Sequence, residues 1–342
     1  MNPTDKCQLS YTYGHLIPTL AMIETAEKNT YVAVANLEEE DENSPPAYSS
    51  MPGAPKPNPI DPDVLLLKQA PVTSSLRGTV LHLRAKAGWT SRFRGFTIFL
   101  VWAMSRGFIG GVITNVPGLR NIFGAMIAHV LAEVCLSTFH LTWIWIVISD
   151  PSPLPWYKRL PPFRRSFPRV APAVAVQAVA NQIATTLPVL LCGAWGPFRR
   201  FGDDYSVPVE KGDLAHAFGQ SILLVGTMLA LFVLLSIPAT VTLTRVAASM
   251  LPDSDETIVP FDRSFGGKVT PAILGGQGKI GMLEAWRSFG WYQRRNLLRV
   301  VTKAFLLIFA VWMLFGLIIM GEVHFIGGDS LRKALKGRMG HQ

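Results

Sequence analysis

Charged side chains are scarce in this sequence: Asp, Glu, Lys and Arg together make up only 16% of its 342 residues. A typical soluble domain contains about 25% of these four residues. Hydrophobic residues account for 49% of the chain, and its mean hydropathy is +0.29. This composition argues against a water-soluble enzyme.

Cysteine is nearly absent as well, and Cys7, Cys135 and Cys192 lie far apart in the chain. Three cysteines at this spacing form neither a disulfide framework nor a zinc site. The sequence also lacks an HExxH motif and a glycine-rich phosphate loop with Walker spacing. We therefore expect no metal and no cofactor, and an intramembrane enzyme is the last of three functional hypotheses.

What the chain does contain is five blocks of apolar residues. A helix needs about 20 mainly apolar residues to cross the hydrocarbon core of a bilayer, and the blocks reach this length. We predict an all-α fold, a polytopic transmembrane helical bundle of about five spans with a disordered N-terminal tail. Within the transmembrane domain, residues 95–325, the predicted spans cover residues 95–114, 122–149, 170–195, 214–246 and 304–325.

The positions of Lys and Arg predict the orientation, because cytosolic loops are enriched in them. Basic residues gather before the first span, between the second and third, and between the fourth and fifth. With five spans, these regions share one side, so we predict a cytosolic N-terminus in the plasma membrane or an endomembrane. The net charge of +9 then reflects topology and attraction to lipid headgroups, and no nucleic-acid partner is expected.

The C-terminal tail, residues 326–342, is also basic, although five spans place it opposite the cytosol. A hidden sixth crossing around Thr270–Leu283 would resolve this conflict, so the choice between five and six spans stays open. The cytosolic loop before the last span is predicted to contain an amphipathic helix at about residues 281–300, lying on the membrane surface.

Residues 1–94 form a predicted cytosolic tail. Acidic and proline-rich composition predicts disorder at about residues 36–75, and basic and aromatic residues predict an interfacial segment at 77–94. Pro45, Pro46 and Tyr48 belong to a PPxY sequence, the form that WW domains bind. The second hypothesis is therefore a membrane-anchored adaptor that recruits a WW-domain ubiquitin ligase; the alternative is a chance match in a proline-rich tail.

Polar residues inside a span are costly, so each is a candidate functional residue. Arg106 lies about 12 residues before the turn near Gly118 and Glu133 about 15 after it, which places them within roughly 5 Å of the same depth and predicts an ion pair. The first hypothesis is a non-enzymatic protein that binds or transports a small solute along a polar path; the alternative is hydrogen bonding between helices. The candidate residues are Arg106, His129, Glu133, His140, Gln177, Asn181, Thr185, His216 and Gln220.

Two stretches carry a resemblance. The segments Trp89–Phe96 and Leu251–Lys268 resemble parts of uncharacterised multi-pass membrane proteins of filamentous fungi. The resemblance extends over about residues 75–325 and implies a fungal membrane protein. It implies no activity and assigns a role to no residue.

Overall fold

The computed structural model describes residues 10–25, 71–195, 211–269 and 278–339, and these residues form helices joined by loops. Within these ranges there is no β-strand, only an isolated bridge between Ser149 and Thr257. The elements in chain order are η1 (Thr12–Leu16), α2 (Ile17–Ile23), η2 (Val72–Ser74), α3 (Leu76–Ala87), η3 (Trp89–Phe93), α4 (Phe96–Thr114), α5 (Ile122–Cys135), α6 (Ser137–Ile148), η4 (Trp156–Arg159), α7 (Phe163–Trp195), α9 (Lys211–Leu231), η5 (Phe232–Ser236), α10 (Ile237–Ser249), α11 (Met282–Arg287) and α12 (Trp291–Met339).

Four helical stretches are long and apolar enough to cross a membrane: Trp89–Thr114, Phe163–Leu191, Phe218–Ser249 and Trp291–Ile319. The pair formed by α5 and α6 passes the same test but is bent by 59° between the two helices. The all-α fold and the multi-pass membrane class predicted from the sequence are thus confirmed. The predicted span at 122–149 is this bent pair rather than one straight helix.

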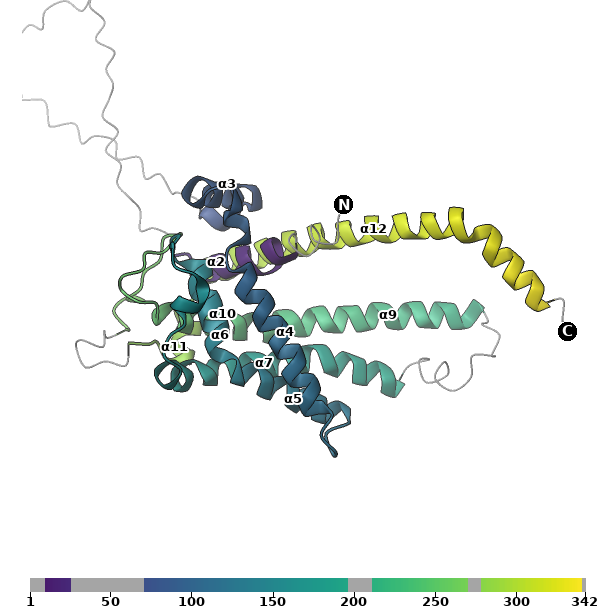
Figure 1. Ribbon diagram of the computed structural model, residues 1–342, viewed down its shortest axis with the longest axis horizontal. Coiled ribbons are helices and arrows are strands. Elements are labelled where there is room, and N and C mark those ends of the chain that lie inside the picture. Colours follow the sequence, from purple (N-terminus) through teal and green to yellow (C-terminus); the bar gives the residue numbers. More distant parts are fainter. Residues whose placement is uncertain (1–9, 26–70, 196–210, 270–277, 340–342) are drawn as a thin grey trace, which may run out of the picture.

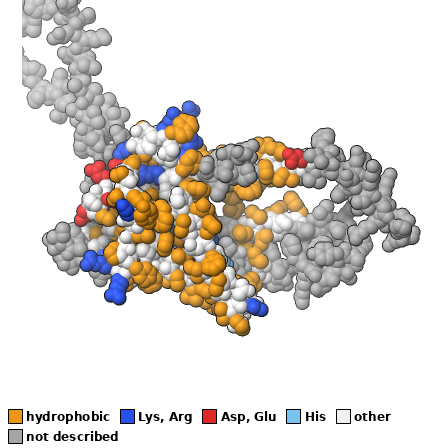
Figure 2. Space-filling model, viewed as in Figure 1, with side chains coloured by type: hydrophobic (Ala, Val, Ile, Leu, Met, Phe, Trp, Pro, Cys, Tyr) orange, Lys and Arg blue, Asp and Glu red, His pale blue; other side chains and the backbone are white. Residues whose placement is uncertain are grey.

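The outer surfaces of the spans are apolar. On α4, Met104 is 67% exposed and Phe108 is 73% exposed, and these side chains form a surface suited to lipid. Figure 2 shows hydrophobic side chains over much of the visible face, with Lys and Arg side chains mainly toward one end. The helices α3 and α11 lie toward that end, and α7, α9 and α12 extend away from it (Figure 1).

Two helices contain π-helical turns, η1 and η5, and each turn is followed by an Ile-Pro pair. Proline lacks an N–H, and its ring collides with the carbonyl four residues earlier, so the regular α-helical hydrogen bonding is interrupted there. A π-helical turn accommodates the misfit. Near these prolines, the hydroxyls of Thr19 and Thr240 donate hydrogen bonds of 2.8 Å and 2.7 Å to the carbonyls of His15 and Ser236.

The N-terminal segment from η1 through α2 lies inside the bundle. It packs against α6, α10 and α12, and Leu16, Ile17 and Leu20 have no exposed surface. The two elements together are about 18 Å long, which is too short to cross a membrane, so the apolar-block pattern does not predict their burial. The stretch predicted to be disordered, residues 36–75, lies mostly outside the described residues.

Polar contacts fix this segment. The Tyr11 hydroxyl donates to the Arg94 carbonyl and accepts a 3.1 Å hydrogen bond from Trp143 Nε1. Burial raises the pKa of Tyr11, so the phenol stays protonated and remains a donor. At the other end of the segment, Gln293 of α12 donates a 3.1 Å hydrogen bond to the Glu24 carbonyl.

The loop before the last span differs in detail from the prediction. The amphipathic helix predicted at 281–300 is divided into α11 and the start of α12, with Ser288–Gly290 between them. Arg294 closes the junction, because its guanidinium donates to the carbonyls of Phe289 and Trp286 and lies 4.0 Å from the Trp286 ring centre. The helix α12 continues through the residues predicted to form the C-terminal tail and ends at Met339. Most of the predicted hidden crossing falls outside the described residues.

Candidate binding site between the spans

Two cavities lie between the helices and share part of their walls. We call them the Thr185 cavity, of about 650 Å³, and the Glu133 cavity, of about 510 Å³. Small-molecule sites in proteins occupy about 300–1,000 Å³, so both are large enough for a ligand. The residues common to both walls are Arg106 of α4, Asn181 of α7, Phe232 of η5 and Phe305 of α12.

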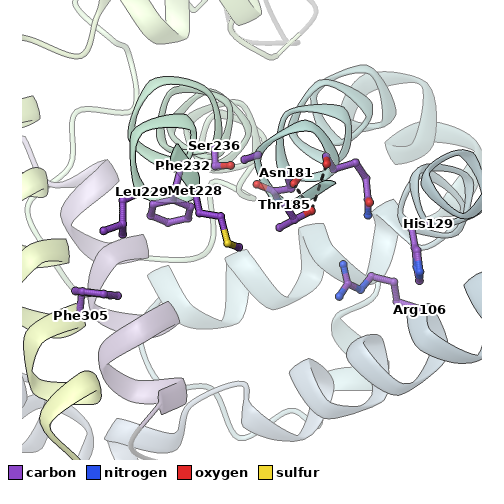
Figure 3. A pocket seen from close by; sticks show the side chains of 11 residues that line it. Arg106, His129, Asn181, Thr185, Met228, Leu229, Phe232, Ser236 and Phe305 are labelled. Atoms are coloured by element: carbon purple, nitrogen blue, oxygen red, sulfur yellow. Dashed lines mark hydrogen bonds between the residues drawn. The ribbon is translucent and has the colours of Figure 1, made fainter. Parts of the chain in front are cut away.

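Figure 3 shows how the walls of the Thr185 cavity are arranged. Arg106 points into the space from one side, toward Asn181 and Thr185 of α7, and Phe305 lies on a different side. Ser236 is only 2% exposed, and its hydroxyl oxygen has no hydrogen-bond partner within the described ranges. The cavity therefore combines apolar walls with several polar groups.

Arg106 and Glu133 come together across α4 and α5. The Nε atom of Arg106 lies 3.6 Å from Oε2 of Glu133. This contact agrees with the ion pair expected from the similar depths of the two residues in their helices. The Glu133 side chain is 4% exposed, whereas the Arg106 side chain is 43% exposed. At 3.6 Å the contact is an ion pair but is too long for a hydrogen bond.

His140 lies on the other side of Glu133. Its Nδ1 atom is 3.8 Å from Oε1 of Glu133, again beyond hydrogen-bond distance. Since α5 ends at Cys135 and α6 begins at Ser137, the two residues sit on either side of the bend. Within the described part of the chain, neither Oε2 of Glu133 nor Nδ1 of His140 has a hydrogen-bond partner. Buried polar atoms of this kind point to a ligand, an ion or water.

The three candidate residues of α7 are divided between the two cavities. Gln177 lines the Glu133 cavity, Asn181 lines both, and Thr185 lines the other. Gln177 is 7% exposed, and its Oε1 atom has no hydrogen-bond partner among the described residues. Thr185, in contrast, donates its hydroxyl to the Asn181 carbonyl at 2.9 Å, so this donor is already used within the helix.

His129 lines the Thr185 cavity at the contact between α4 and α5. The two helices approach closely here, because a Cβ atom at Gly110 would lie 2.7 Å from Nδ1 of His129. A glycine at this position of α4 therefore leaves room for the imidazole ring.

Of the other candidate residues, the structure describes the side chain of Gln220 alone. Gln220 lines neither cavity. His216 belongs to α9, in a part whose side chains are outside the described set. The PPxY residues Pro45, Pro46 and Tyr48 also lie outside the described residues, and the adaptor hypothesis stays a prediction from the sequence.

The cavities also contain residues that the sequence does not single out. Tyr13 and His15 of η1, together with Phe99, Trp102 and Trp143, line the Glu133 cavity. The His15 ring lies 4.7 Å from Phe99 and the His140 ring 4.7 Å from Trp102, measured between ring centres. The sequence feature that could have indicated these residues is the Ile-Pro pair, because both π-helical turns next to such pairs contribute residues to this cavity.

The described residues contain no group of three or more His, Cys, Asp or Glu side chains that could hold a metal ion. No protein-family model, no curated protein and no solved structure matches the chain. The geometry of the two cavities is thus the basis for a functional proposal.

Proposed function

We propose that this integral membrane protein binds a small solute in the two joined cavities and passes it between the two sides of the membrane. The observation that carries the proposal is a pair of ligand-sized cavities lined by buried polar residues whose side-chain oxygens have no hydrogen-bond partner within the described ranges. Oε2 of Glu133 and Oε1 of Gln177 meet this description in the Glu133 cavity, and Oγ of Ser236 meets it in the Thr185 cavity.

The alternative role for such residues is hydrogen bonding between helices. Residues with that role pair with one another across the interface, and each pair contributes about 0.6 kcal/mol on average. Glu133, Gln177 and Ser236 leave side-chain oxygens without partners in the described structure, which is the opposite of what an interhelical contact requires. The bend between α5 and α6 adds support, since transporters place substrate sites at discontinuous helices.

Reconstitution into lipid vesicles tests the proposal. Purified full-length protein is placed in vesicles, and uptake of a radiolabelled panel of organic anions, amino acids and sugars is compared with uptake by protein-free vesicles. We expect at least one solute to enter only with protein. Asn181→Leu should reduce that uptake about tenfold or more, because Asn181 lines both cavities.

The matched control is Thr227→Val on α9. Thr227 lines neither cavity, and its hydroxyl donates to the Leu223 carbonyl within its own helix, so uptake should stay at the wild-type level. Equal loss in both variants would attribute the effect to folding. A panel in which no solute enters above the protein-free level would contradict transport.

A further inference from the structure

We infer that the solute is a small organic anion and that it occupies the Glu133 cavity together with one proton. This inference rests on the proposed function and specifies its substrate class. The structural basis is the long 3.6 Å contact of Arg106 with Glu133, in a cavity whose other described lining residues include no Asp, Glu, Lys or Arg.

Arg106 supplies the anion-binding group. Arg106 lines both cavities, and its Nε atom lies 3.6 Å from Oε2 of Glu133. Within the described ranges, Arg106 makes a ring contact with Trp102 at 5.7 Å and donates no hydrogen bond. Its terminal N–H groups therefore suit a carboxylate or sulfonate, which a guanidinium binds in bidentate fashion.

Glu133 supplies the proton-binding group. When an anion pairs with the terminal N–H groups of Arg106, its negative charge offsets the positive charge that Arg106 presents to the Glu133 carboxylate, whose side chain stays 4% exposed. A buried carboxylate without a cation or hydrogen bonds is costly, and protonation at Oε2 removes that cost. Anion and proton together bring no net charge into the low-dielectric region, which favours their binding as a pair.

The groups around Glu133 indicate that this residue is the one that takes up the proton. The ionisable groups that contact it are Arg106 from α4 and His140 from α6. Tyr13 and His15 from η1 line the same cavity, and His129 lies one turn earlier on α5. The residues that α7 and α12 contribute to the Glu133 cavity carry no charge. Glu133 is the only acidic side chain among the described residues that line either cavity. An incoming anion therefore repels the Glu133 carboxylate, and this residue takes up the proton.

The remaining walls indicate the body of the solute. The lining of the Glu133 cavity includes the aromatic rings of Phe99, Trp102, Trp143 and Phe305. Such walls favour a flat, apolar body beside the anionic group. An aryl carboxylate or aryl sulfonate fits both requirements.

Calorimetry with benzenesulfonate tests the inference, because this strong acid stays anionic at all working pH values, so any proton taken up belongs to the protein. Titrations of full-length protein in two buffers of different ionisation enthalpy should show uptake of about one proton per anion bound. The dissociation constant should rise about tenfold per pH unit where Glu133 is ionised. Benzenesulfonamide, which is neutral, should bind more weakly and without proton uptake.

Variants identify the groups. Arg106→Gln should lose benzenesulfonate binding, while Arg120→Gln, in the exposed loop, should keep it. Glu133→Gln should bind the anion equally at every pH without proton uptake, whereas His140→Gln should retain uptake. Proton uptake that persists in Glu133→Gln would overturn the assignment. Failure of benzenesulfonate to bind, in a preparation that still transports another solute, would overturn the inference and leave the proposed function standing.

Discussion

Two glutamates, Glu24 and Glu133, are buried to a similar degree, with exposed fractions of 5% and 3%, yet their carboxylates have opposite surroundings. The Glu24 carboxylate accepts hydrogen bonds from the backbone N–H groups of Val72 and Thr73 and from the Thr73 hydroxyl. Among the described residues, the Glu133 carboxylate has two long contacts with charged or ionisable groups, 3.6 Å to Arg106 and 3.8 Å to His140.

The difference separates a structural carboxylate from one available to a ligand. Glu24 joins the buried N-terminal segment to the residues that precede α3, and Asn296 of α12 extends this connection with a 3.3 Å hydrogen bond to the Thr73 hydroxyl. Every one of these contacts is used within the fold. Glu133 lines a cavity and leaves an oxygen unpartnered, so its burial costs stability unless something binds beside it.

The largest effect is expected at the structural carboxylate. Glu24→Gln removes the charge that accepts these hydrogen bonds and replaces one acceptor oxygen with an NH₂ group that faces N–H donors. We expect the free energy of unfolding to fall by about 2 kcal/mol. Denaturant unfolding in detergent micelles, followed by tryptophan fluorescence, measures this change.

Glu256→Gln is the matched control, because the Glu256 side chain is exposed. Its free energy of unfolding should stay within about 0.5 kcal/mol of the wild type. Equal losses in the two glutamate variants would contradict a structural role that depends on hydrogen bonds to Glu24.

A smaller effect is expected from the cation beside Glu133. Arg106→Gln leaves the buried carboxylate without its ion-pair partner, so the free energy of unfolding should fall by about 1 kcal/mol. The double variant Arg106→Gln/Glu133→Gln should return close to the wild type, since neither charge is then left unpaired. Strictly additive losses in the same unfolding assay would show that the two side chains do not interact.

The spans and the pairing of Arg106 with Glu133 can be predicted from the sequence, because both depend on local properties of the chain. Apolar length predicts the spans, and counting helical rise from Gly118 places Arg106 and Glu133 at similar depths, where the structure has them 3.6 Å apart. Both inferences use only the geometry of a helix and a short turn, which hold wherever the helix packs.

The remaining parts depend on contacts between distant segments. The short helix α2 is buried by α6, α10 and α12, and nothing in its length or apolar content identifies these partners. The partners of Glu24 at Val72 and Thr73 lie 48 and 49 residues further along the chain. For the same reason, the sequence predicts one span over residues 122–149 but does not reveal the bend that separates Glu133 from His140, or that His15 lines the same cavity.

The smallest effect is expected when the charge of Glu133 itself is removed, and this variant tests the comparison most directly. Glu133→Gln is nearly isosteric and discards no hydrogen bond of the described structure, while it also discards the cost of a buried charge. The free energy of unfolding should therefore stay within about 0.5 kcal/mol of the wild type, although the same substitution at Glu24 costs about 2 kcal/mol. A group held ready for a ligand contributes little to folding until the ligand binds. A loss of stability at Glu133 as large as that at Glu24 would therefore contradict the comparison, since it would mean that both carboxylates stabilise the fold.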